Sequence, residues 1–188
     1  ETGAEFTFLK EWSAGITMYE MRTSDEIYYN PVAYMSINAP DETRRRGLEA
    51  ALRWARERAG AFGIAYELAD SRFSEGVFKD NDVPLTPDHM LTLNGEAQLL
   101  SCLAALGTAR YVASQTSGSD FANQAARLDA YATLDLGLRY EPVFVKGLRL
   151  IGGVDNVFDK EYAYCGFYGS SYYPANGRTW KLCAAYTF

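Results

Sequence analysis

The chain has 188 residues, of which 48% are hydrophobic and 14% aromatic, but no apolar run approaches the roughly 18 residues of a membrane-spanning helix. The net charge of −6 argues against a nucleic-acid partner. Three scattered cysteines and one histidine, His89, argue against a structural zinc site and a histidine-based catalytic triad, so we expect no enzyme activity, metal or cofactor.

The first part of the chain is predicted to form two strands and a hairpin. Alternation is loose over residues 4–9, and a longer extended run covers 13–29 after a polar break. A turn signal at Asn30-Pro31 allows residues 34–37 to pair back on 26–29 as a hairpin that extends two strands. The apolar face of the run 13–29 is not assigned, because both Ile16 with Met18 and the alternate set with Tyr19 fit it.

Residues 43–60 carry conflicting signals. Glu49 and Arg53 have helical spacing, and several good helix formers lie between and around them. With a period of two, Leu48 and Trp54 fall on one face of a strand, and Glu49 and Arg53 fall on the other. Local propensity alone slightly favours the helix.

The rest of the chain alternates with a period of two in five segments and a closing strand. The five segments span 62–68, 91–97, 103–114, 131–140 and 148–154. In the closing strand, 177–188, one face carries Trp180, Leu182, Ala184, Tyr186 and Phe188. The strand therefore has an aromatic residue near each end, as expected of a strand that crosses a bilayer.

The connections between these segments differ systematically in length. Short ones lie at 10–12, 55–60, 99–102 and 141–146, and long ones at 30–42, 71–89, 115–125 and 158–178. The two kinds alternate along the chain, which is typical of outer-membrane barrels with periplasmic turns and extracellular loops.

Several motifs resemble those of one family. VDNVFDKEY at 154–162 and YPANGRTW at 173–180, followed by the terminal aromatic strand, closely resemble the C-terminal end of TonB-dependent outer-membrane receptors. RRGLE at 45–49 resembles the R-G-x-E strand of that family, DEI at 25–27 its D-x-I strand end, and VPLTPDH at 83–89 the proline-containing lead-in to a later strand. The resemblance covers essentially the whole chain.

The resemblance implies an all-β fold, an antiparallel up-and-down transmembrane β-barrel. Receptors of this family have 22 strands, a plug domain and a short segment that contacts TonB. Residues 1–188 would supply about the last nine strands, as the C-terminal part of such a barrel without its plug or earlier strands, and would not close alone. The segment 43–60 would then be a strand. The first residues lack a signal peptide, so we expect a mature protein or a piece of one.

The resemblance also implies a function and partners. A Gram-negative outer-membrane receptor and transporter would take up a scarce metal chelate, such as a ferric siderophore, haem or cobalamin. The alternative is a passive or structural barrel of the porin or adhesion type. Expected partners are outer-membrane lipid and lipopolysaccharide, the TonB complex through the missing N-terminal part, and the barrel-assembly machinery through the C-terminal strand.

Two sets of residues are candidates for these roles. Loop aromatics suit a flat or chelated ligand, although packing among the loops is an equally good interpretation; they are Tyr34, Phe78, Phe121, Tyr164, Phe167, Tyr168 and Tyr172. The family motif and assembly set comprises Asn156, Phe158, Asp159, Tyr162, Gly177, Arg178, Trp180, Tyr186 and Phe188.

Three smaller features remain open. Residues 44–46, all arginine, would contact lipopolysaccharide phosphates or an anionic ligand, or form a solvated strand end. Residues 80–82 provide an incomplete set of calcium ligands. Cys165 and Cys183 could be bridged only if the last loop folds inward, because strand geometry places Cys183 roughly 16 Å below the base of that loop, so we expect free thiols.

Overall fold

The computed structural model describes residues 1–30, 34–39, 41–167 and 171–188. The strands are β1 Thr2–Phe8, β2 Trp12–Thr23, β3 Ile27–Asn30, β4 Met35–Asn38, β5 Thr43–Arg56, β6 Gly60–Phe73, β7 His89–Leu100, β8 Leu103–Val112, β9 Tyr131–Tyr140, β10 Leu148–Asp155, β11 Ala163–Phe167, β12 Ser171–Pro174 and β13 Thr179–Tyr186. Within these ranges, no helix is long and apolar enough to cross a membrane.

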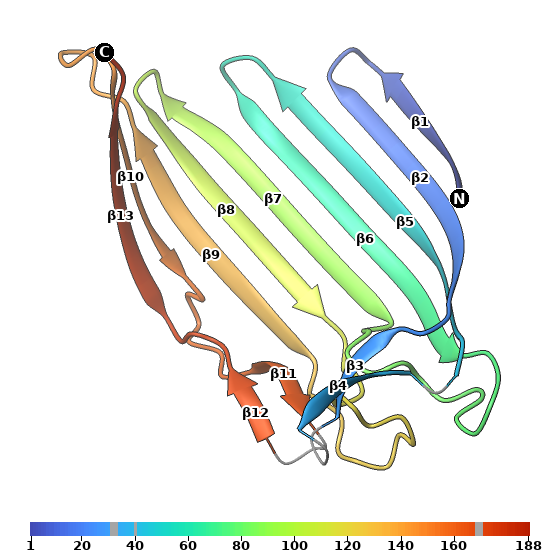
Figure 1. The fold of residues 1–188 in the computed structure, drawn as a ribbon. Helices are drawn as coiled ribbons and strands as arrows, with labels where there is room; N and C mark the ends of the chain where they lie inside the picture. Colours follow the sequence, from blue (N-terminus) through green and yellow to red (C-terminus); the bar gives the residue numbers. More distant parts are fainter. Residues whose placement is uncertain (31–33, 40, 168–170) are drawn as a thin grey trace.

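Nine strands form one antiparallel sheet in the order β1-β2-β5-β6-β7-β8-β9-β10-β13 (Figure 1). Two hairpins, β3–β4 and β11–β12, stand apart from it. The edge strands β1 and β13 do not pair with each other, so the sheet is open, as predicted. The number of strands in a whole barrel stays a prediction.

The segment with conflicting signals is strand β5, which confirms the interpretation drawn from the resemblance. It pairs along its whole length with β6 and over twelve residues with β2. Hydrogen-bond ladders on both sides of the strand therefore outweigh a helical preference of a few tenths of a kcal/mol per residue. The helical spacing of Glu49 and Arg53 instead places both on the same face of a strand.

The register gives the sheet one apolar and one polar face. Directly opposed residues share a face, and the row Phe8–Trp12–Trp54–Phe62 continues through β7 to β10 and ends at Trp180. This row begins beside the short turns and ends beside the long loops. The hydrogen-bonded register is therefore staggered by roughly one residue per strand along the strand direction, as tilted barrel strands require. The same register assigns the faces left open in β2, with Ile16 and Met18 on the apolar side.

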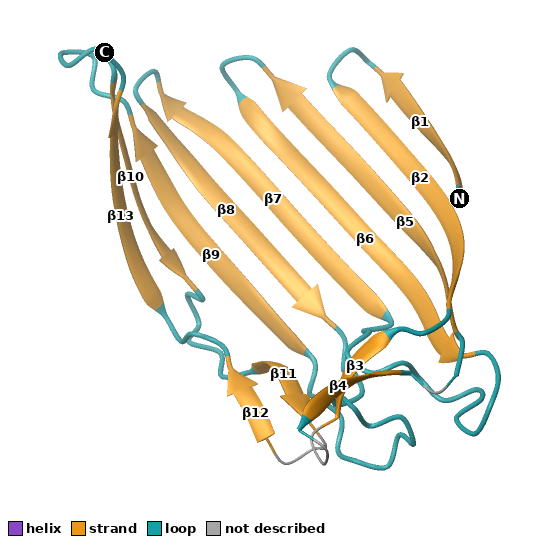
Figure 2. Cartoon of the chain, in the orientation of Figure 1, coloured by secondary structure: helices purple, strands orange, loops and turns teal. Residues whose placement is uncertain are grey.

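Short turns and long loops are sorted to opposite ends of the sheet (Figures 1 and 2). The hairpin expected near residues 26–37 is present, with Tyr28 opposite Ile37. The segment 158–178 was expected to be a loop, but it contains the hairpin β11–β12. Its two tyrosine-containing strands are only five and four residues long and lie among glycine and serine residues, so an apolar–polar alternation is not detectable in the sequence.

The largest fully buried side chains lie in the long loops and at the strand ends beside them. Phe73, Val83 and Ser117 are fully buried, and Leu128 is nearly so. The sheet faces, in contrast, leave large apolar side chains exposed, because a single curved sheet has no second layer to cover it. The long loops therefore pack as a structured unit.

Candidate functional site

The long-loop end forms a packed assembly, which we name the loop cap: the described residues of 24–42, together with 74–88, 113–130 and the described residues of 156–178. Loop 113–130 joins the two hairpins. The Ser119 hydroxyl donates to the Tyr29 carbonyl of β3, and the Gly118 amide donates to the Gly166 carbonyl of β11 at 2.6 Å. The cap therefore ties together loops that are far apart in sequence.

Loop 74–88 is attached to the same unit through polar contacts. The Asn81 side chain donates to the Phe121 carbonyl at 2.8 Å, and Asn123 exchanges two hydrogen bonds with the backbone of Asp82, at 2.7 and 3.0 Å. Asp82 also accepts from Arg127 at 2.8 Å. Asn81 and Asp82, two of the three residues considered above as calcium ligands, thus hold loops together. Among the described residues, no group of three or more His, Cys, Asp or Glu could hold a metal ion.

An aromatic cluster supports the cap from inside. Phe73, Phe78 and Phe121 pack with ring centroids 5.6 to 5.9 Å apart, and Tyr28 meets Phe121 edge-on at 4.9 Å. Phe78 and Phe121 are half-buried here. Sequence reasoning missed Phe73, which ends β6 and is completely buried at the centre of the cluster.

Three of the other ligand candidates are exposed on the cap. Tyr34 is 81% exposed, Tyr164 56% and Tyr172 48%. Phe167 ends β11, and Tyr168 lies outside the described residues. Contact between these side chains and a ligand stays a prediction. Tyr34 lies in the turn of hairpin β3–β4, and Tyr164 and Tyr172 lie in hairpin β11–β12. Loop 113–130 links these two hairpins.

A polar cluster fixes the base of hairpin β3–β4. Glu26 accepts from Arg45 at 2.6 Å and from the Thr43 hydroxyl at 2.8 Å, and Arg45 donates to Thr43 at 2.9 Å. The phenol oxygen of Tyr28 is buried nearby without a hydrogen-bond partner among the described residues. Burial, reinforced by the Glu26 carboxylate, raises the pKa of Tyr28 to about 12.

Asn156 forms a clasp at the base of the last loop. It is 4% exposed and has a left-handed backbone with φ of 51°. Its amide nitrogen donates to the carbonyls of Lys160 and Asn176, at 2.9 and 3.3 Å, and its oxygen accepts from the Lys160 amide at 2.9 Å. Asparagine suits this position because it tolerates the left-handed region and can bond in both directions.

Asp159 extends the clasp to the other side of the loop. Its carboxylate accepts from the Arg178 amide at 2.7 Å, and a Cβ at Gly177 would lie 2.9 Å from the same oxygen. Tyr162 stacks on Tyr131 of β9 with ring centroids 4.0 Å apart. These contacts explain physically why the motif needs these residues, whereas Phe158 is 74% exposed and contributes none of them.

The remaining motif residues lie on β13 or just after its end. Trp180 is 78% exposed, Tyr186 53% exposed, and Phe188 fully exposed. Tyr186 and Phe188 meet edge-on with ring centroids 5.1 Å apart. Their assigned role in barrel assembly stays a prediction.

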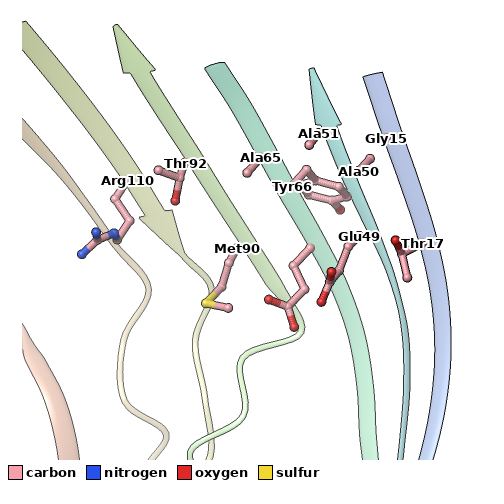
Figure 3. A pocket seen from close by; sticks show the side chains of 11 residues that line it. Gly15, Thr17, Glu49, Ala50, Ala51, Ala65, Tyr66, Met90, Thr92 and Arg110 are labelled. Atoms are coloured by element: carbon pink, nitrogen blue, oxygen red, sulfur yellow. The ribbon is translucent and has the colours of Figure 1, made fainter. Parts of the chain in front are cut away.

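The polar face carries a shallow hollow of about 310 Å³ over β2, β5, β6, β7 and β8 (Figure 3). Glu49 and Glu67 are directly opposed across β5 and β6, and Arg110 lines the other side of the hollow. Tyr19 covers Gly47 and donates to Glu67 at 3.4 Å. A Cβ at Gly47 would lie 2.7 Å from the Tyr19 ring, so the glycine in the R-G-x-E pattern makes room for this tyrosine.

Further along the polar face, opposite charges are paired. Arg139 of β9 donates both terminal nitrogens to the Glu96 carboxylate of β7, and Lys181 of β13 pairs with Asp155 of β10. Cys102, Cys165 and Cys183 are free thiols, and burial raises the pKa of the Cys165 thiol. Charged partners on one face and an apolar opposite face are the arrangement expected of strands that separate a polar interior from lipid.

Comparisons with known proteins agree with this geometry. The family model of the TonB dependent receptor-like β-barrel matches residues 1–157. No curated protein sequence matches the chain. Among solved structures, the ferric-catecholate import receptor Fiu from E. coli K12 is similar over 99% of this chain, with 23% identity and a TM-score of 0.78.

Two further solved structures show the same fold. The siderophore receptor PiuA from Acinetobacter baumannii covers 98% of this chain at 19% identity, and the ferric citrate transporter FecA covers 99% at 18% identity, both with a TM-score of 0.80. The chain spans 27% of the length of Fiu and of PiuA and 30% of that of FecA. With most of its length matched by the family model, the chain belongs to the TonB-dependent receptor-like β-barrel family.

Proposed function

We propose that residues 1–188 are the C-terminal part of the barrel of an outer-membrane receptor that takes up a scarce metal chelate by a TonB-dependent mechanism. The observation that carries the proposal is the open nine-stranded sheet, apolar on one face and charged on the other, with its long loops packed into a cap at one end. A soluble sandwich would have to cover the apolar face with a second layer.

The two faces have distinct roles in this proposal. The apolar face, with the row from Trp12 to Trp180, contacts lipid, and the polar face lines the interior, where water or a plug domain solvates Glu49, Glu67 and Arg110. Backbone groups inside the bilayer are satisfied only if the sheet closes. The free edges of β1 and β13 are therefore each proposed to pair with strands outside this chain, β13 with the first strand of the barrel.

The loop cap is the proposed ligand-binding surface. Tyr34, Tyr164 and Tyr172 are exposed on it, while Phe78 and Phe121 pack inside and hold the loops in position. Aromatic faces suit a flat or chelated ligand. Fiu and PiuA are described as ferric-catecholate and siderophore receptors, which supports a ferric siderophore as the first candidate before haem or cobalamin.

The energy for transport and the assembly of the barrel are proposed to depend on segments and partner proteins outside this chain. TonB would act through the N-terminal plug and coupling segment, and β13 would be recognised by the barrel-assembly machinery. The cap itself performs no chemistry in this scheme. It would select the chelate, and movement of the plug would admit it to the periplasm.

Growth under iron limitation tests the proposal. A strain that lacks the gene for the full receptor should grow poorly when candidate chelates are the only iron source, and the wild-type gene should restore growth in a TonB-dependent manner. Restoration that persists without TonB would overturn the receptor proposal in favour of a passive barrel.

A pair of variants tests the ligand surface. Tyr34→Ala combined with Tyr164→Ala should weaken chelate binding by roughly thirtyfold, since each of the two rings contributes about 1 kcal/mol of stacking. Phe144→Ala is the matched control, because Phe144 is an equally exposed aromatic side chain (82%) on a short turn at the opposite end of the sheet. Unchanged binding in the double variant would remove these tyrosines from the site.

A further inference from the structure

Three arginines are directly opposed on neighbouring strands. Arg22 of β2 pairs in register with Arg44 of β5, and Arg44 pairs with Arg72 of β6. Directly opposed side chains have Cβ atoms about 5 Å apart, and like charges at that separation destabilise a sheet. We refer to Arg22, Arg44 and Arg72 as the arginine row.

Carboxylates neutralise only the two outer members of the row. Arg22 lies 3.4 Å from Glu20 and 3.8 Å from Glu42, and Arg72 lies 2.7 Å from Asp70. Arg44 makes no ion pair within the described ranges. The central charge of the row is therefore left without an anion.

The row lies on the apolar face, on the side that the proposed function turns toward lipid. Its neighbour Arg45 points to the other face, where it pairs with Glu26. Along β5, Arg44 is ten residues from Trp54, which corresponds to about 33 Å of strand. With strands tilted by about 40°, the row stands about 25 Å above the level of Trp54, which is the height of the apolar band of such barrels.

The side chains on the membrane side of the arginine row support this position at the edge of the apolar band. Tyr66 and His89 face outward on β6 and β7, and the Tyr66 hydroxyl lies 2.8 Å from the His89 Nδ1 atom. Tyrosine rings gather at the boundary between lipid tails and headgroups. The arginine row lies beyond them, at the level of the headgroups on the long-loop side.

We propose that the arginine row binds phosphate groups of a glycolipid in the outer leaflet, of the lipid A type. Three guanidinium groups spread over two strand spacings, about 10 Å, can hold one phosphate centrally or two phosphates of a single lipid. The outer carboxylates keep Arg22 and Arg72 extended along the surface, and Arg44 supplies the free charge. The inference rests on the proposed outer-membrane location and adds a lipid ligand to it.

Lipid retention by the full receptor tests the site. The receptor is reconstituted into phosphatidylethanolamine nanodiscs that contain bis-phosphorylated lipid A, and bound lipid A is counted by native mass spectrometry. Arg44→Gln should weaken lipid A binding by about tenfold, the effect of losing one charge-assisted hydrogen bond. Arg58→Gln, which removes the same charge from an exposed position on a short turn, should bind like wild type.

The remaining arms separate the possible outcomes. Dephosphorylated lipid A should bind to wild type and to Arg44→Gln with equal affinity. If Arg44→Gln fails to insert into nanodiscs, Arg22→Gln is measured in its place. Equal binding of bis-phosphorylated lipid A by wild type and the row variants would overturn the proposal, as would Arg44-dependent binding of inorganic phosphate at the same concentration without lipid. Failure of the wild-type receptor to insert into nanodiscs would instead refute the proposed function.

Discussion

The clasp at Asn156 should control the local stability of the last loop. Replacing Asn156 by alanine removes three side-chain hydrogen bonds, two to Lys160 and one to Asn176. At about 1 kcal/mol each they contribute about 3 kcal/mol, and the left-handed φ of 51° adds about 1 kcal/mol for alanine. Asn156→Gly loses the hydrogen bonds but tolerates the backbone, so it should be the milder variant.

Hydrogen exchange of the full receptor in detergent measures this effect. The Lys160 amide, which donates to the Asn156 oxygen, should exchange on the order of a hundredfold faster in Asn156→Gly and faster still in Asn156→Ala. Phe158→Ala is the matched control within the same motif, because Phe158 is 74% exposed. Protection of Lys160 within about threefold of wild type in Asn156→Ala would refute the assigned clasp.

Two further predictions concern the strands and the first hairpin. Gly47→Val should prevent the barrel from acquiring its heat-resistant gel mobility, because a Cβ at this position lies 2.7 Å from the Tyr19 ring. Gly15→Ala is the control and should fold, because its Cβ has its nearest neighbour at 3.9 Å. Normal mobility of Gly47→Val would contradict the packing described. Tyr28 should ionise near pH 12 in an ultraviolet titration compared with Tyr28→Phe. Because the unfolded hairpin releases this proton near pH 10, β3–β4 should lose stability as the pH rises from 10 to 12, and a Tyr28 transition near 10 would be inconsistent with burial.

Sequence periodicity was sufficient to predict most strands of the sheet. The strand β9 was predicted with its observed bounds, because residues 131–140 alternate without interruption. The face of β2 could not be assigned, since Thr17 and Tyr19 are as compatible with lipid as Ile16 and Met18. Only the register opposite β5 decides it, by placing Tyr19 over Gly47.

The loop cap was less predictable, for a physical reason. Its segments were identified as loops from their polar composition, but the burial of Phe73 and Val83 results from contacts between loops far apart in sequence. No local pattern encodes such contacts. The motif around Asn156 is recognisable as a sequence pattern, but its role as a clasp depends on contacts with Lys160 and Asn176, which no local pattern predicts.

The three consecutive arginines show how strand geometry divides one sequence feature between two roles. Because side chains alternate along β5, Arg45 points to the polar face and anchors hairpin β3–β4 through Glu26, while Arg44 and Arg46 point to the opposite face. Arg46 pairs with Asp70 at 2.7 Å, which leaves Arg44 as the one member without an ion pair in the described part of the chain. The cluster therefore combines an internal anchor for the loop cap with an outward charge at the level proposed for lipid phosphates, and substitutions at 44 and 45 should affect lipid binding and hairpin order separately.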